Sequence, residues 1–129
     1  MKWDNSPVRP PHTVAAVLLL SPDPALLAAF YREKLAFPLV PVNLPDLEPH
    51  FGCEVGHVYI SIWPSPNPVP NTARERGAIV AYYVSDVAEE VKRLESQGVP
   101  VVLPPKRTRL GMIARLEDPD GNLFELYQP

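Results

Sequence analysis

The chain reads Glu117-Asp118-Pro119-Asp120-Gly121-Asn122-Leu123-Phe124-Glu125-Leu126 near its C-terminus. Proline fixes φ at the first turn position, while Asp, Gly and Asn favour local hydrogen bonds or positive φ. The stretch therefore predicts a hairpin turn between two strands. Because side chains alternate along a strand, Glu125 shares one face with Leu123 and Tyr127. A carboxylate among such apolar neighbours needs a metal, a hydrogen-bonded ligand or solvent.

Composition limits the classes of protein and of partner. The chain has 129 residues, 46% hydrophobic and 21% charged, which suits one globular domain over residues 1–129. The net charge is -3, and the basic residues cluster only at residues 106–109, so neither nucleic acid nor a membrane surface is an expected partner. One cysteine allows no intramolecular disulfide, and the N-terminus lacks a signal-peptide pattern. We therefore expect a cytoplasmic protein.

The hydrophobic pattern divides the chain into two similar halves. In the first module, residues 13–63, we predict a strand at 13–20, a helix at 24–35 and strands at 38–42, 48–54 and 57–63. Residues 64–77 form the predicted linker. In the second module, residues 78–127, we predict a strand at 78–84, a helix at 87–97 and strands at 101–103, 112–117 and 122–127. Each half has the order β-α-β-β-β, which makes the fold class α+β.

Both predicted helices have clear start signals. Asp23 can cap the first helix, with Pro24 at its first position. Ser85 or Asp86 can cap the second helix, and Gly98 stands where a left-handed C-cap is expected. A strand, a turn containing Asp and an amphipathic helix therefore occur twice, as in a duplicated module.

These features together resemble the vicinal oxygen chelate superfamily, which contains glyoxalase I, extradiol dioxygenases and bleomycin-resistance proteins. The resemblance covers residues 14–127 and rests on four sequence elements: Asp23 with Phe30-Tyr31, Leu35-Ala36-Phe37, Ala81-Tyr82-Tyr83-Val84-Ser85-Asp86, and Asp118-Pro119-Asp120-Gly121-Asn122 with Glu125-Leu126. It implies two βαβββ modules whose sheets curve into a cupped, incomplete barrel with the helices outside and a ligand cavity inside. It also implies a homodimer, in which each cavity is built at a pair of modules.

The resemblance also locates the positions where metal-dependent relatives carry their ligands. These positions fall at Ala16, Ser61, Ile79 and Glu125. Alanine and isoleucine have no lone pair to donate, and one carboxylate cannot supply the three protein ligands of a usual catalytic site. We therefore expect no metal and no cofactor. A shift of four residues in the first strand would bring His12 to the position of Ala16, and this alternative stays open.

The strand parity taken from the family predicts an apolar and aromatic cup. The opposite parity, which includes Val17, Leu19, Val80, Tyr82, Phe124 and Leu126, is expected to pack under the helices. Aromatic faces supply contact area in small-molecule sites, and a few polar groups fix the ligand's orientation. The predicted ligand-binding residues are Tyr59, Ser61, Trp63, Tyr83, Glu125 and Tyr127.

The other reactive side chains do not indicate a catalytic site, and the catalytic residues stay unknown. Cys53 is interpreted as a small buried hydrophobe, and His50 and His57 are interpreted as surface loop residues. No Gly-x-Ser-x-Gly motif is present.

Two functions follow from the sequence. The first is a metal-free binding protein, closest in type to bleomycin-resistance proteins, that sequesters an aromatic or cationic compound. The second is a metal-dependent lyase, isomerase or dioxygenase of the same superfamily that uses Glu125 as a ligand, or a metal-free enzyme that uses it as general base. A third possibility is a closed cavity and a role in protein interaction.

Overall fold

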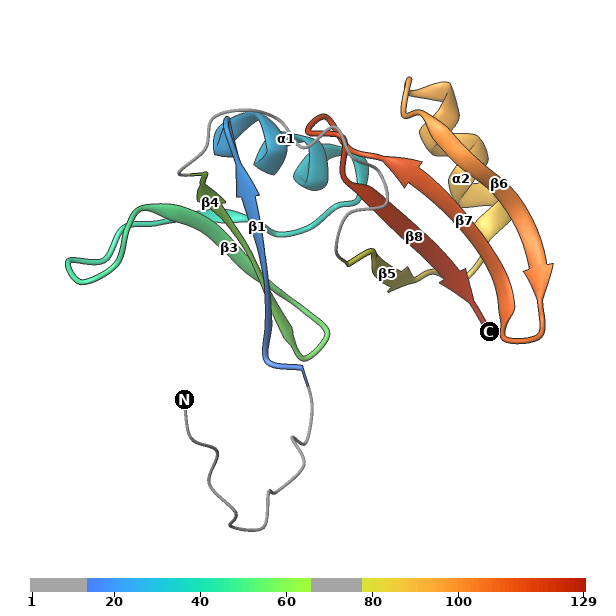
Figure 1. Cartoon of the computed structure of the whole chain (residues 1–129), viewed down its shortest axis with the longest axis horizontal. Coiled ribbons are helices and arrows are strands. Elements are labelled where there is room, and N and C mark those ends of the chain that lie inside the picture. The colour runs from blue at the N-terminus through green and yellow to red at the C-terminus, as the bar shows by residue number, and fades with distance from the viewer. Residues whose placement is uncertain (1–13, 66–77) are drawn as a thin grey trace, which may run out of the picture.

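The computed structural model describes residues 14–65 and 78–129 of the chain. The first half contains β1 (Ala16–Ser21), α1 (Pro24–Lys34), β2 (Val40–Val42), β3 (His50–Val55) and β4 (Val58–Pro64). The second half contains β5 (Val80–Tyr83), α2 (Val87–Ser96), β6 (Val101–Thr108), β7 (Gly111–Glu117) and β8 (Leu123–Gln128). Each half is a βαβββ module (Figure 1), so the predicted α+β fold is confirmed. Most of the predicted linker and His12 lie outside the described residues.

Each module contains one mixed sheet of four strands. The strand orders are β1-β4-β3-β2 and β5-β8-β7-β6, so the two sheets have the same topology. The first strand of each module pairs in parallel with the last, β1 with β4 and β5 with β8, and the other pairs are antiparallel. Within the described residues the two sheets share no strand pair. Strands β1 and β5 are therefore both edge strands.

Both helices begin at the predicted caps. The Asp23 carboxylate accepts a hydrogen bond from the Leu26 amide at 3.2 Å, and the Asp86 carboxylate accepts one from the Glu89 amide at 3.1 Å. These bonds satisfy backbone donors that have no partner in the first helical turn. Gly98 follows α2 with a φ of 83°, as its predicted role in the C-cap requires.

Each helix covers one face of its own sheet and forms a core there. The α1 core contains Leu27 and Ile62, and the α2 core contains Leu94 and Phe124. Five of the six residues predicted under the helices pack in these cores: Val17, Leu19, Tyr82, Phe124 and Leu126. Phe30, Leu35 and Tyr82 contact both cores and so join the two modules.

The turn at residues 118–122 is a second junction between the modules. It connects β7 to β8 as predicted, but it is not exposed, because Asp118 and Asp120 are only 4% and 6% accessible. The Tyr31 hydroxyl on α1 donates to Asp118 Oδ2 at 2.7 Å, and the amides of Asp120 and Asn122 donate to Asp118 Oδ1. The turn of the second module is therefore bound by the helix of the first (Figure 1).

Three local predictions need correction or extension. Strand β6 runs through Pro104 and Pro105 to Thr108, and register shifts on either side of Leu103 let it continue past the prolines. His50 is not a surface loop residue, because it lies on β3 with 6% exposure; His57 is exposed, as predicted. Cys53 is a buried free thiol whose pKa is raised by burial, which agrees with its interpretation as an inert residue.

No helix within residues 14–65 and 78–129 is long and apolar enough to span a bilayer.

Candidate functional site

The face of each sheet that does not contact its helix, called here the inner face, carries the six predicted ligand-binding residues. In the second module, cross-strand pairing fixes two rows of side chains on this face. One row contains Ala81, Glu125 and Arg115, and the next contains Tyr83, Tyr127, Ile113 and Lys106. Successive rows are two residues apart along each strand, or about 7 Å.

Two tyrosines form the aromatic part of this second-module inner face. The ring centroids of Tyr83 and Tyr127 are 5.3 Å apart, and the rings are tilted by 49°. The Tyr127 hydroxyl donates to the Leu110 carbonyl at 2.6 Å, which fixes its ring, while Tyr83 is 80% exposed. A broad aromatic surface is thus open for contact.

Glu125 lies on the same face but is not a lone carboxylate. Arg115 Nε donates to Glu125 Oε1 at 3.1 Å, and the two side chains are 39% and 18% exposed. The pair is the cross-strand pair of β7 and β8, so the hairpin itself aligns the two charges. The carboxylate that the sequence places among apolar neighbours therefore has a guanidinium beside it.

The inner face of the first module is built around Trp63. Its indole stacks on the His50 ring with centroids 3.7 Å apart, and its Nε1 donates to Ser61 Oγ at 2.8 Å. Ser61 in turn donates to the Val17 carbonyl at 3.4 Å. Tyr59 covers Gly52 so closely that a Cβ there would meet its ring. Ser61 is 2% exposed and already has its partners, so the surface offered to a ligand is mainly aromatic and aliphatic.

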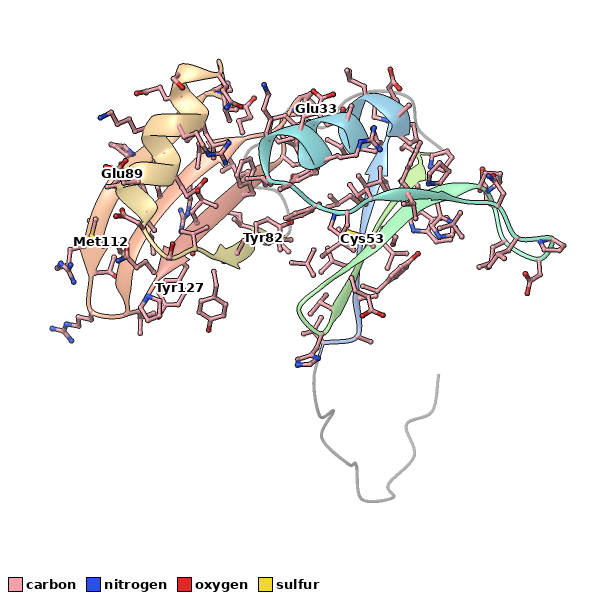
Figure 2. The ribbon with its side chains drawn as sticks, turned by 180° about the vertical axis from the view of Figure 1, so that it is seen from behind. Glu33, Cys53, Tyr82, Glu89, Met112 and Tyr127 are labelled. Atoms are coloured by element: carbon pink, nitrogen blue, oxygen red, sulfur yellow. The ribbon has the colours of Figure 1, made fainter. Side chains whose placement is uncertain are left out.

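The structure brings the six residues together as two groups of three. Tyr59, Ser61 and Trp63 share β4, while Tyr83, Glu125 and Tyr127 share β5 and β8. In the described part of the chain, no hydrogen bond or ring contact joins one group to the other. Figure 2 shows Tyr127 and Cys53 on the sheets of different modules, with Tyr82 near the junction. Leu18 and Leu20, on the inner face of β1, are 59% and 57% exposed.

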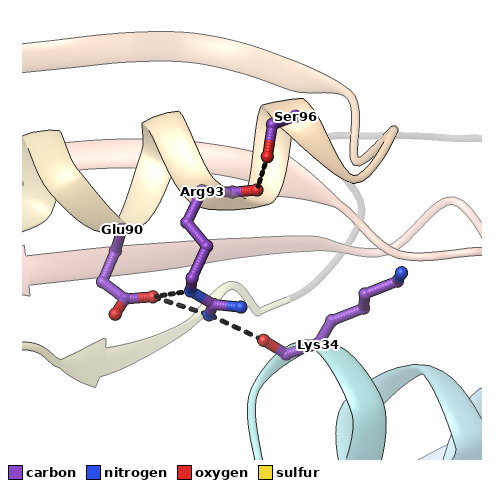
Figure 3. A network of polar contacts seen from close by, with 4 residues as sticks. All are labelled: Lys34, Glu90, Arg93 and Ser96. Atoms are coloured by element: carbon purple, nitrogen blue, oxygen red, sulfur yellow. Dashed lines mark hydrogen bonds and ion pairs between the residues drawn. The ribbon is translucent and has the colours of Figure 1, made fainter.

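A groove of about 1040 Å³ runs between the modules. Apolar side chains of β5, the end of α1 and the β3–β4 turn line it, and Tyr83 is the one residue of the predicted six among its walls. Arg93 at its border donates to Glu90 Oε2 at 2.7 Å and to the Lys34 carbonyl at 2.8 Å (Figure 3). These contacts join α2 to the end of α1, so Arg93 holds the modules together at the groove.

The sequence profile of the Glyoxalase/Bleomycin resistance protein/Dioxygenase superfamily matches residues 10–126. The chain belongs to this superfamily. Comparison with curated protein sequences found no significant match.

Several solved structures share the superfamily fold with this chain. TnmS3, an antibiotic binding protein from Streptomyces sp. CB03234, aligns with a TM-score of 0.76 and 24% identity over 95% of this chain and 99% of its own. Lactoylglutathione lyase from Agrobacterium tumefaciens aligns with a TM-score of 0.69 and 22% identity over 93% and 96%. TioX from Micromonospora sp. ML1 aligns with a TM-score of 0.68 and 22% identity over 90% and 98%. At these identities the likeness establishes the fold.

The four positions at which metal-dependent superfamily members carry ligands do not fit a divalent cation in this chain. Glu125 is bound to Arg115, Ser61 is bound to Trp63 and Val17, and Ala16 and Ile79 have no donor atom. Nor do three His, Cys, Asp or Glu side chains gather at any other point of residues 14–65 and 78–129.

Sequence reasoning missed Arg115 and His50 on the inner faces, and hairpin register could have found both. The turn at residues 118–122 places Glu117 opposite Leu123. Two residues further from the turn on each strand, Arg115 is opposite Glu125. The turn at Gly56 and His57 pairs Phe51 with Ile62, so the next residue outward, His50, is at the level of Trp63.

Proposed function

We propose that this superfamily member is a metal-free small-molecule-binding protein that sequesters an aromatic compound against its inner faces. The observation that carries the proposal is the make-up of these faces: exposed aromatic and aliphatic side chains surround few polar groups, as in small-molecule sites. The likeness to TnmS3, an antibiotic binding protein, supports the same class of function. Of the aromatic and cationic ligands predicted from sequence, the Arg115–Glu125 pair favours the aromatic ones, because Arg115 neutralises the carboxylate.

The proposed site is completed by a second copy of the chain. Within one chain Leu18 and Leu20 on the first inner face and Tyr83 on the second are more than half exposed. Exposed apolar surface of this kind can mark an interaction site. In a homodimer, the first-module face of one copy can cover the second-module face of the other. A ligand held between them would lose most of its contact with water.

Titration with the neutral dye N-phenylnaphthylamine, followed by its fluorescence, tests the binding function. We expect saturable binding that survives exhaustive chelation and dialysis. Tyr83→Ala and Trp63→Ala should each weaken it by about tenfold, because each removes an aromatic contact worth roughly 1–1.5 kcal/mol. Leu26→Ala is the matched control, since Leu26 is 54% exposed on α1, away from the inner faces. Binding that is absent, or that ignores both aromatic substitutions, would refute the proposal.

An enzymatic role is the second candidate, because lactoylglutathione lyase has the same fold and Glu125 keeps one carboxylate oxygen outside its contact with Arg115. General base catalysis by Glu125 would be abolished by Glu125→Gln. Sequestration predicts instead that the bound compound is recovered chemically unchanged, which mass spectrometry of the released ligand decides.

A further inference from the structure

Arg115 is placed on the second-module inner face by the strand that carries it. Its neighbours in sequence, Ala114 and Leu116, are fully buried in the α2 core, so Arg115 must point to the other side of the sheet. It keeps 39% of its side chain exposed there. The position is therefore held by a rigid sheet and still accessible to a ligand.

The guanidinium of Arg115 is used on one side only. Its Nε bonds to Glu125, while among the described residues its Nη1 and Nη2 have no partner. Arg93 offers a contrast within the same chain, because its Nε and Nη2 both bond to Glu90 and Nη2 also reaches the Lys34 carbonyl. The five donors of a guanidinium form a planar fork, and at Arg115 the outer part of this fork is left for another molecule.

The surroundings of Arg115 indicate what that molecule carries. The adjacent row holds Tyr127 and Tyr83, so a planar ring stacked there lies about one row, or roughly 7 Å, from the guanidinium. Lys106, paired with Ile113 in the same row, adds a second positive charge at this end of the face. The carboxylate of Glu117 lies on the same face but on the turn side of Arg115, opposite Leu123. The face thus carries two cations and two carboxylates, and the cations lie nearer the aromatic row than Glu117 does: Lys106 is in that row, and Arg115, paired with Glu125, is in the next.

Resting on the proposed binding function, we infer that Arg115 is the specificity-determining residue of this site and selects aromatic ligands that carry an anionic oxygen. A carboxylate, sulfonate or phenolate on the ring accepts hydrogen bonds from the free Nη groups. Glu125 holds the guanidinium in place through Nε and weakens its positive charge, so it limits the affinity for anions.

A pair of dyes with the same ring system tests the inference. Anilinonaphthalene sulfonate is anionic, and N-phenylnaphthylamine lacks the sulfonate. Arg115→Gln is expected to weaken binding of the anionic dye by at least about tenfold, the size of one charge-assisted hydrogen bond, and to change the neutral dye by less than about twofold. Glu125→Gln should strengthen binding of the anionic dye and leave binding of the neutral dye unchanged. If Arg115 only stabilised the sheet, its substitution would change the binding of both dyes to a similar extent.

Two further variants serve as controls. Arg107→Gln removes an exposed arginine from the neighbouring strand, where its pairing with Met112 places it on the helix side, so neither dye should respond. Arg115→Lys keeps the positive charge but loses the planar guanidinium, so it should weaken binding of the anionic dye by an intermediate factor. If Arg115→Gln does not fold, Arg115→Lys replaces it in the test.

The outcomes separate the two proposals. If both dyes respond equally to Arg115→Gln, or if neither responds, the role of Arg115 is refuted while the binding function stands. If wild-type protein does not bind the neutral dye, the binding function fails, and the inference falls with it.

Discussion

Asp118 and Asp120 show how a turn motif can serve a long-range contact. Both carboxylates are almost fully buried, and desolvation raises the pKa of each. Asp118 offsets part of this with bonds from Tyr31, Asn122 and two turn amides, which favour its charged form. Asp120 offsets less of the desolvation: one hydrogen bond, with Ser21, lowers its pKa, its buried Oδ2 has no hydrogen-bond partner in the described structure, and the nearby Asp23 raises its pKa. Asp120 is therefore the costlier carboxylate.

Asp120→Asn should stabilise the protein at neutral pH. A carboxyl group whose pKa is raised by folding contributes stability below its unfolded pKa, about 3.9, and loses that contribution as the pH rises through its folded pKa. The amide avoids the buried charge, so we expect a gain of about 1 kcal/mol at pH 7 that shrinks toward zero near pH 4.

Urea unfolding at several pH values measures this effect. Asp46→Asn, at an exposed carboxylate in the chain between β2 and β3, is the control and should leave the free energy of unfolding unchanged at pH 7. If Asp120→Asn raises the free energy of unfolding equally at pH 4 and pH 7, the stabilisation does not come from removing a buried charge at Asp120.

At the residue scale, the sequence predicted the face on which a side chain lies better than the residues that it contacts. The strand parity taken from the family resemblance placed Tyr83, Glu125 and Tyr127 on the face away from α2, where the structure has them. Alternation alone says nothing about neighbours on other strands, so Arg115 went unnoticed until the register was known. His50 was misread because the glycines around it were taken as turn signals, whereas Gly52 is needed in β3 to leave room for Tyr59.

At the scale of the element, local signals fixed the ends of both helices. Asp, Pro and Gly act within a few residues through backbone hydrogen bonds and φ preferences, so their effect can be read without the tertiary structure. Strand β6 was predicted too short because its continuation depends on the tertiary structure and not on local signals. Its two prolines cannot donate ladder bonds, and only its position at the sheet edge, with its register shifts, makes them tolerable.

Asp86→Ala should destabilise the protein by about 1 kcal/mol, the usual cost of losing a helix N-cap. The Glu89 amide would lose its acceptor, and no other side chain in the described structure bonds to it. Urea unfolding gives the value, with Ser85→Ala as control, because Ser85 was the other cap candidate and makes no hydrogen bond of this kind. A larger loss from Ser85→Ala would mean that the cap is misassigned.

At the scale of the whole molecule, the two modules are joined through Phe30 and Leu35 of α1 and Tyr82 of β5, which pack against both cores. On the inner faces, Leu18, Leu20 and Tyr83 stay exposed. The predicted two-module fold follows from patterns that repeat within each half. The way in which the halves meet depends on Tyr31, Phe30 and Tyr82, whose partners lie in the other half of the chain. No periodicity within one half reveals such contacts.

Leu18→Glu should convert the proposed homodimer to a monomer without unfolding the chain, because Leu18 is 59% exposed within one copy. A charge buried in an apolar interface has no compensating partner there. Sedimentation velocity at micromolar concentration measures the change, and Leu26→Glu on the outer side of α1 should leave the dimer intact. Wild-type protein that sediments as a monomer under these conditions would overturn the homodimer.

The bond between Tyr31 and Asp118 also bears on how the chain folds. It joins residues 87 positions apart, whereas most strand pairs connect neighbours within one module. Contacts between distant residues form late, because the intervening chain must first lose its conformational freedom. We therefore expect each half to organise its own sheet first, and the Asp118 turn to close onto α1 afterwards.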